Sequence, residues 1–354
     1  MAAVVGLHLT RTADNAAAID ALASDLARDG GGRVGIDGLL PDLSRQLRRT
    51  RAPHPRLLGR KVTGAWTWEA EDRRDRRWWP QGITTSAFTG VRERHGHDVL
   101  MTTWYSKKGE GSRVSVVDVE RRRYAHVLLV MPTLTDGRPG ITPLKVHAGG
   151  IVWHGDHVHV AATGKGFMTC RTADLLRVPA GSPYETFGHR YVLPVRFAHR
   201  GGHEEGVSRL RFSFFSLDRT TTPPTLAVGE YGSTPQKTRR FARFALDPAT
   251  GLPQPDAEGR AAPEIDERGE VRMQGMAVAD GTTYVTASAS GFLPGTVYAG
   301  SPGAFRRFRA ATPPGPEDLV WWPETGSLWT VTEHPRRRWI VAMRRSGFGA
   351  RSGR

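Results

Sequence analysis

The chain has 354 residues, and its 38% hydrophobic content, with 10 Trp and 13 Phe, is enough for a packed core, which excludes a wholly disordered protein. Its formal net charge is +15, but the basic residues are mostly Arg and no nucleic-acid-binding motif accompanies them, so we predict no nucleic-acid partner. Cys170 is the only cysteine, which excludes intramolecular disulfides and cysteine-based zinc sites.

Residues 1–60 are predicted to form a helical N-terminal extension. The segment Thr12–Asp29 reads as an amphipathic helix that ends at three glycines, and a second helix is predicted over Asp37–Arg49. We recognise no signal peptide, and no apolar stretch reaches membrane-spanning length. We therefore expect a cytoplasmic protein without membrane association, with secretion as the alternative if a leader is missing from this sequence.

A short phrase recurs four times from Gln81 onward. In each copy an apolar residue follows Gly or Asp, a strand runs on, and a turn leads into a second strand; the copies begin at Gln81, Gly149, Gln274 and Glu317. Recurring hairpins with no helical pattern between them are typical of a radially repeated sheet. We therefore predict an all-β fold, a β-propeller over residues 61–345.

The predicted strands group into five blades. These cover residues 81–131, 147–197, 210–246, 274–310 and 317–343. The last blade shows only three strands, and the strand predicted over Lys61–Ala70 would complete it, closing the ring with strands from both ends of the chain. Six blades are the alternative if the segment from Pro248 to Arg272 hides another. Residues 346–354 are predicted to be a disordered basic tail, and we expect a monomer.

Polar groups gather in two kinds of loop. In a propeller blade, the loop that leads into the innermost strand and the loop between the second and third strands open on the same face, around the axis. We call this end of the axis the mouth. Five of the six lysines fall in these loops, although lysines are common in loops of any kind: Lys107, Lys108, Lys145, Lys165 and Lys237. The pattern predicts a mouth that binds a small polar or anionic molecule.

Three residues are candidates for acid–base chemistry at the mouth. His147 stands before Ala148-Gly149-Gly150, where small residues let a ligand or another backbone come close, and it is either a catalytic base or a hydrogen-bonded channel histidine. Glu317 and Glu230 are candidate acids or electrostatic partners, although Glu317 could instead bond neighbouring backbone, as Glu333 could pair with an arginine among Arg336–Arg338. The candidate substrate-binding residues are Gln81, Gln274, Tyr105, Lys165, Asp318, Glu333, Glu204 and Tyr231.

Cofactor motifs are not found in the sequence. It contains no phosphate loop, dinucleotide fingerprint or Gly-x-Ser-x-Gly motif, so no organic cofactor is predicted. His154, His157 and His159 stand on or beside one predicted turn, and we interpret them as surface or edge histidines rather than metal ligands. A divalent metal held by mouth carboxylates stays an open alternative.

Several phrases of the chain resemble uncharacterised, usually secreted-type, actinobacterial β-propeller proteins. The resemblance covers about residues 62–345 and rests on His147-Ala-Gly-Gly-Ile151, Gly229-Glu230-Tyr231, Gly315-Pro-Glu-Asp-Leu319 and Trp329-Thr-Val-Thr-Glu333-His-Pro335. It implies the fold and no particular activity. More distantly the chain is similar to the calcium-dependent gluconolactonase and strictosidine-synthase-like propellers, which place acidic and Asn ligands on the axis. Here the only asparagine is Asn15, outside the blades, so calcium lactonase chemistry is not expected.

These patterns favour an enzyme that acts by acid–base chemistry, a hydrolase, lyase or cyclase of a biosynthetic or secondary-metabolic pathway. The main alternative is a non-catalytic propeller that binds a carbohydrate or a protein partner. Binding propellers tend to repeat one pocket on every blade, whereas each blade here brings different residues to the mouth, which favours catalysis.

Overall fold

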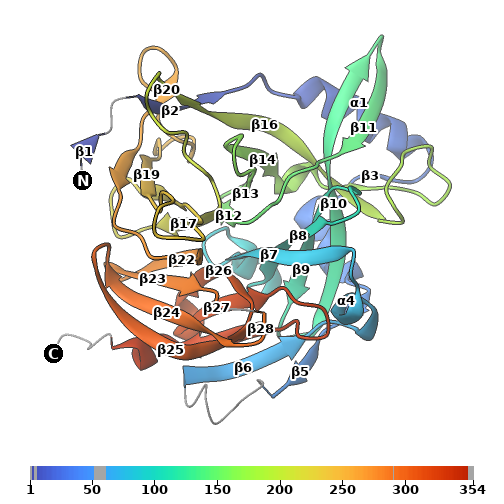
Figure 1. Ribbon diagram of the computed structural model, residues 1–354. Helices are drawn as coiled ribbons and strands as arrows, with labels where there is room; N and C mark the ends of the chain where they lie inside the picture. Colours follow the sequence, from blue (N-terminus) through green and yellow to red (C-terminus); the bar gives the residue numbers. More distant parts are fainter. Residues whose placement is uncertain (1, 4–5, 52–60, 290, 350–354) are drawn as a thin grey trace.

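The computed structural model describes residues 2–3, 6–51, 61–289 and 291–349, and these are organised almost entirely as antiparallel sheets (Figure 1). No helix in this part of the chain is long and apolar enough to cross a membrane. The helical segments are short: α1 (Ala16–Arg28), α2 (Gly35–Leu39), α4 (Ala70–Arg74), α5 (Val91–His95) and the 3-10 turns η1 (Leu40–Asp42), η3 (Thr172–Asp174), η4 (Pro323–Thr325) and η5 (Arg345–Phe348).

The first two predicted blades merge into one barrel-like sheet. One half contains β7 (Trp78–Thr85), β8 (Leu100–Ser106), β9 (Ser112–Asp118) and β10 (Arg123–Thr135), and the other contains β12 (Ile151–His154), β13 (His157–Ala161), β14 (Phe167–Arg171) and β16 (Tyr191–His203). The outer strands β10 and β16 pair in parallel, with Leu128 opposite Val192 and Val130 opposite Pro194. The innermost strands β7 and β12 also contact each other, so the sheet returns on itself.

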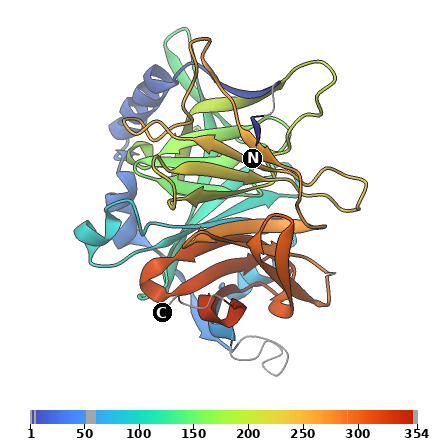
Figure 2. The same cartoon turned by 90° about the vertical axis from the view of Figure 1, so that its left-hand side faces the viewer.

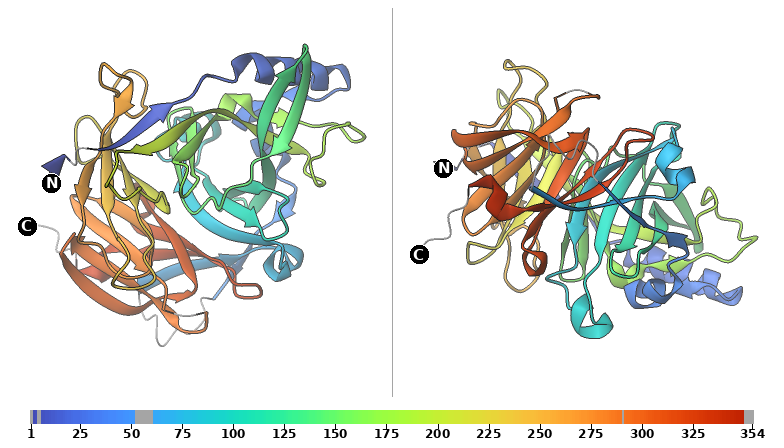
Figure 3. Two further views of the ribbon diagram at one scale, coloured as in Figure 1. Left: turned by 45° about the horizontal axis from the view of Figure 1, so that its top comes forward. Right: turned by 90° about the horizontal axis from the view of Figure 1, so that it is seen from below.

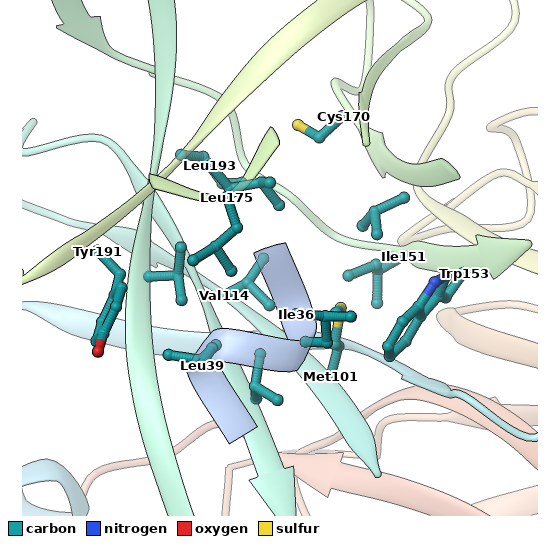
Figure 4. Packing of buried hydrophobic residues seen from close by; sticks show 14 of the residues in the cluster. Ile36, Leu39, Met101, Val114, Ile151, Trp153, Cys170, Leu175, Tyr191 and Leu193 are labelled. Carbon is teal, nitrogen blue, oxygen red and sulfur yellow. The ribbon is translucent and has the colours of Figure 1, made fainter. Parts of the chain in front are cut away.

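Small strands extend this sheet at its edges. They are β2 (Leu7–Arg11), β3 (Gly32–Arg33), β4 (Arg45–Gln46), β11 (Arg138–Pro143), β15 (Leu176–Arg177) and β20 (Arg260–Ala261). Inside the barrel, α2 places Ile36 and Leu39 against side chains of β9 and β12, as Figure 4 shows. The barrel therefore has its own apolar core on one face of its strands, and a second apolar cluster, which includes Leu128 and Val130, covers the other face.

Three further sheets complete the fold. The first contains β17 (Phe214–Asp218), β18 (Thr225–Gly229), β19 (Phe241–Ala245), β21 (Glu264–Asp266) and β1 (Ala2–Ala3). The second contains β22 (Met273–Ala279), β23 (Thr282–Ala287), β24 (Pro294–Ser301) and β25 (Ala304–Pro314). The third contains β26 (Pro316–Trp322), β27 (Ser327–Thr332), β28 (Ile340–Arg344), β6 (Val62–Thr67) and β5 (Arg48–Thr50). As predicted, the N-terminal strand β6 completes the last sheet by pairing with β28.

The innermost strands form a closed ring of contacts. β7 contacts β12, and the contacts continue through β17, β22 and β26 back to β7. Glycines permit this approach: a Cβ on Gly275 would lie 2.3 Å from Asp318 Cα, and one on Gly150 would lie 2.5 Å from the Phe215 nitrogen. Antiparallel sheets radiating from a ring of inner strands are the β-propeller architecture. Figure 1 shows β7, β12, β17, β22 and β26 close together at the centre, and the left view of Figure 3 shows the barrel beside them as a ring of green and cyan strands.

The N-terminal segment differs from the prediction. The first helix is present as α1, on the outside of the barrel against β10 and β11 (Figure 2). The second helix is wrong beyond Leu39, because the chain continues as η1 and then as β4 and β5, whose backbones pair with β10 and β6. The predicted domain boundary at residue 60 stays a prediction, since residues 52–60 lie outside the described residues.

The C-terminal boundary lies later than predicted. Phe348, placed by the sequence in a disordered tail, is 2% exposed and packs edge-on against Phe308, with ring centroids 5.4 Å apart. Residues 350–354 lie outside the described residues.

Candidate functional site

One open cavity of about 510 Å³ lies at the mouth. Its lining comes from the starts of innermost strands and from loops that follow second strands: Gln81, His147, Gly149, Thr163, Arg211, Ser213, Tyr231, Lys237, Gln274, Glu317 and Glu333. Six of these are predicted site residues: Gln81, His147, Tyr231, Gln274, Glu317 and Glu333. The ring of inner strands thus brings together residues far apart in the sequence.

Glu317 is a buried carboxyl group on β26 that lines the cavity. Its residue is 4% exposed, and burial raises its pKa well above the usual value, with the charges of Glu333 and Asp318 acting in the same direction. A carboxyl group in such surroundings keeps its proton at a pH where an exposed glutamate is ionised. Glu317 can therefore donate a proton to a molecule in the cavity.

Glu333 is the second carboxyl group of the cavity. Burial raises its pKa, whereas Lys107, Gln81 and Arg338 oppose the increase. Gln81 Nε2 donates to Glu333 Oε2 at 3.4 Å, and His334 Nδ1 lies 3.4 Å from Oε1. Because its partners favour the ionised form, Glu333 is the more acidic of the two mouth carboxyls.

His147 is the titratable base of the cavity. Burial, helped by the charge of Lys107, lowers its pKa, so the neutral imidazole is favoured near neutral pH. The ring of Tyr105 stacks on the imidazole with centroids 4.5 Å apart. Tyr105, predicted to bind substrate, is not part of the cavity lining and instead holds His147 in place. Lys107 is itself held by Trp79, with Nζ 3.1 Å from the ring centroid.

Asp318, predicted to bind substrate, lies on the axis beneath the cavity and is fully buried. Its Oδ1 accepts from the Leu319 nitrogen at 2.9 Å, and its Oδ2 accepts from the nitrogens of Ile83 and Ile151, each at 3.4 Å. Burial nevertheless raises its pKa well above the usual value. Asp318 is absent from the cavity lining, and its role is to tie three inner strands together.

Glu230 is held in a buried ion pair and does not line the cavity. Its carboxylate is completely buried and forms a two-point ion pair with Arg240, with Nη2–Oε1 and Nε–Oε2 distances of 2.9 and 3.0 Å. The backbone nitrogens of Arg211 and Arg240 also donate to it. Burial acts to raise the pKa of Glu230, but these donors outweigh it and lower the pKa, so the group stays ionised and engaged. The catalytic role stays a prediction, and the geometry favours a structural role.

Two predicted binding residues lie away from the cavity. Glu204 is exposed just beyond the end of β16, because this strand runs on to His203 and the next inner strand, β17, begins only at Phe214. Lys165 is exposed in the loop after β13, where Thr163 lines the cavity instead.

Sequence reasoning missed four polar lining residues: Thr163, Arg211, Ser213 and Lys237. Lys237 belongs to the group of loop lysines, which was the available signal. Arg211 and Ser213 lead into β17, whose start lacks the glycine-containing phrase of the other inner strands. Arg211 Nη2 donates to the carbonyls of Tyr231 and Thr238, which fixes the guanidinium at the cavity wall.

In the described part of the chain, no group of three or more His, Cys, Asp or Glu side chains is arranged to hold a metal ion. The prediction that all three turn histidines lie at the surface or at a sheet edge is wrong for His159. Its residue is 1% exposed, and its Nδ1 lies 3.0 Å from Thr169 Oγ1.

Comparison with known proteins adds little to this geometry. No protein-family model matches the chain, and no curated protein matches it. The resemblance to actinobacterial propellers therefore stays a hypothesis. Among solved structures, glutaminyl cyclase from Myxococcus xanthus is 13% identical, with a TM-score of 0.38 over 76% of this chain and 94% of that one.

Two other solved structures are similarly remote. A gluconolactonase from Xanthomonas campestris is 12% identical, with a TM-score of 0.38 over 84% of this chain and 94% of its own. The β-propeller domain of Cps50 from Myceliophteria thermophila is 10% identical, with a TM-score of 0.41 over 80% of this chain and 99% of its own. Likenesses at this level carry no argument about activity, which has to come from the cavity itself.

Proposed function

We propose that this protein is an enzyme that acts by acid–base chemistry on a small polar or anionic molecule bound at the mouth of a five-bladed propeller. The observation that carries the proposal is that Glu317 and His147 line one cavity, while their surroundings shift their pKa values in opposite directions. Groups separated in this way can serve as acid and base in one reaction.

The roles follow from the protonation states. The neutral imidazole of His147 takes a proton from water or from the substrate. Deprotonated water or a deprotonated substrate group then attacks as the nucleophile, or loss of a substrate proton leads to elimination. The protonated carboxyl of Glu317 gives its proton to the departing oxygen or nitrogen. Glu333 supplies a negative charge in the cavity wall, and the amides of Gln81 and Gln274 orient the substrate. Hydrolysis, elimination and cyclisation all use this pair of transfers.

The cations of the wall support an anionic or strongly polar substrate. Arg211 and Lys237 line the cavity, and Lys107 lowers the pKa of His147 from nearby. The five-blade count is supported by the ring of five inner strands, β7, β12, β17, β22 and β26. Between Pro248 and Arg272 the only strands are the short β20 and β21, in a segment that is described throughout, so a sixth blade has no strands to build it.

The test begins with a panel of lactones, glycosides and amides, screened with purified protein for turnover. For a compound that reacts, His147→Ala and Glu317→Gln should each reduce kcat/KM about 100-fold or more while the thermal midpoint stays nearly unchanged. Lys165→Ala is the matched control, since Lys165 lies in a mouth loop outside the cavity, and it should keep wild-type turnover.

The pH profile gives a second readout. The rate should fall on the acid side as His147 becomes protonated and on the alkaline side as Glu317 loses its proton, and Glu317→Gln should remove the alkaline limb. Turnover that survives both substitutions would overturn the proposal. Saturable binding of panel compounds without turnover would favour the non-catalytic alternative.

A further inference from the structure

A second cavity, of about 180 Å³, opens at the end of the axis opposite the mouth. Ile83, Ile151 and Leu319 line it, and each directly follows the glycine or aspartate position of its inner strand. Because the amides of these same residues donate to Asp318, the axial carboxyl group separates the two cavities. Nothing in the acid–base proposal uses this second cavity.

The walls of the second cavity are largely apolar. They include Phe88, Trp153, Phe215, Leu217, Val278 and Trp321. Its volume is below the roughly 300–1,000 Å³ of sites for drug-sized ligands, so the space suits a single ring or a short chain. An apolar space of this kind favours an apolar group over water.

Arg219, an exposed residue, places a positive charge at the edge of this lining. Its guanidinium carbon lies 3.6 Å from the centroid of the Phe88 ring, and Nη2 lies 3.3 Å from His154 Nδ1. Within the described residues no carboxylate pairs with it: the adjacent Asp218 is taken by Arg243, and Asp280 of the same cavity is taken by Arg345. Burial alone lowers its pKa to about 10, so it remains charged at neutral pH.

We propose that this cavity binds a small amphipathic carboxylate, with the carboxylate on Arg219 and a ring or short chain among the apolar walls. The planar guanidinium offers two parallel donors to a carboxylate, and the Phe88 ring beneath it fixes its plane. Charge complementarity therefore selects an acid over the corresponding alcohol or amine. The site is independent of the mouth, because the axial carboxyl group lies between them.

The experiment uses three probes of one shape, 3-phenylpropanoate, 3-phenylpropanol and 3-phenylpropylamine, titrated into the full chain by calorimetry. The acid should bind at least about 10-fold more tightly than the alcohol or the amine, since hydrogen bonds between two charged groups are stronger than those to a neutral group. Arg219→Gln should remove this preference. Leu217→Trp, which fills the cavity from a partly exposed wall position, should abolish binding of all three.

Two controls locate the binding. Arg200→Gln removes an exposed arginine outside the described cavities and should leave the affinity unchanged. His147→Ala should also leave it unchanged, because His147 belongs to the mouth. Equal affinity for acid and alcohol, undetectable binding of the acid, or loss of binding in His147→Ala would each overturn the inference, whatever the outcome for catalysis.

Discussion

Replacing Glu230 by Ala tests whether this residue anchors the fold or takes part in chemistry. The substitution leaves the Arg240 guanidinium, in a residue that is 5% exposed, without its carboxylate, and it removes the acceptor of two backbone nitrogens. Breaking a buried ion pair from one side typically costs about 3–5 kcal/mol, because the remaining charge stays buried. We therefore expect the free energy of unfolding to fall by about that amount.

Urea unfolding followed by tryptophan fluorescence measures this loss. Glu230→Met combined with Arg240→Met should lose less than Glu230→Ala alone, since no unpaired charge remains. Asp156→Ala is the control, because its ion pair with Arg171 is exposed on both sides and such pairs contribute at most about 1 kcal/mol. A loss below about 1 kcal/mol for Glu230→Ala, with turnover abolished, would refute the structural role.

Two further outcomes follow from the packing of the inner strands and of the barrel. Gly275→Ala should destabilise by about 1–3 kcal/mol or more, because its Cβ would lie 2.3 Å from Asp318 Cα; Gly164→Ala, with nothing within 4 Å, should change urea stability by less than about 0.5 kcal/mol. Burial, helped by the positive charges of Arg11 and His157, lowers the pKa of His199 to about 3, so stability that is complete above pH 6.5 should fall on acidification, by about 2 kcal/mol at pH 5. His199→Gln should flatten that dependence, and an unchanged pH slope in this variant would contradict the assignment.

The sequence predicts the inner strands and the mouth because both follow from local signals. Hairpin turns and the glycine phrase place the starts of β7, β22 and β26, and with them Gln81, Gln274 and Glu317. Strand β17 lacks that phrase, so the sequence predicts its entry at Glu204, whereas Arg211 is the residue before β17 that lines the cavity. The pairing of Glu230 with Arg240 across β18 and β19 also depends on strand register, which the sequence does not specify there.

The joining of the first two sheets could not be predicted for a different reason. The parallel pairing of β10 with β16 connects residues far apart in the chain, and both strands read simply as buried apolar runs. Periodicity identifies such strands but not their partners. The packing of α2 into the barrel core could not be predicted for the same reason. The apolar residues Ile36 and Leu39 indicate that one side of the helix is buried, but not against which strands.

The recurring phrase at the start of the inner strands contributes both to the stability of the ring and to the raised pKa of Glu317, because its second residue lies at the propeller axis. Where inner strands meet, Gly82, Gly150 and Gly275 have no room for a side chain, and Asp318 is the exception that fills the centre. There its carboxyl group accepts the amides that point to the axis, which closes the channel and holds the ring. The same burial places Asp318 beside Glu317 and raises the pKa of the mouth carboxyl further. The group that stabilises the centre of the ring therefore also favours the protonated form that acid catalysis at the mouth requires.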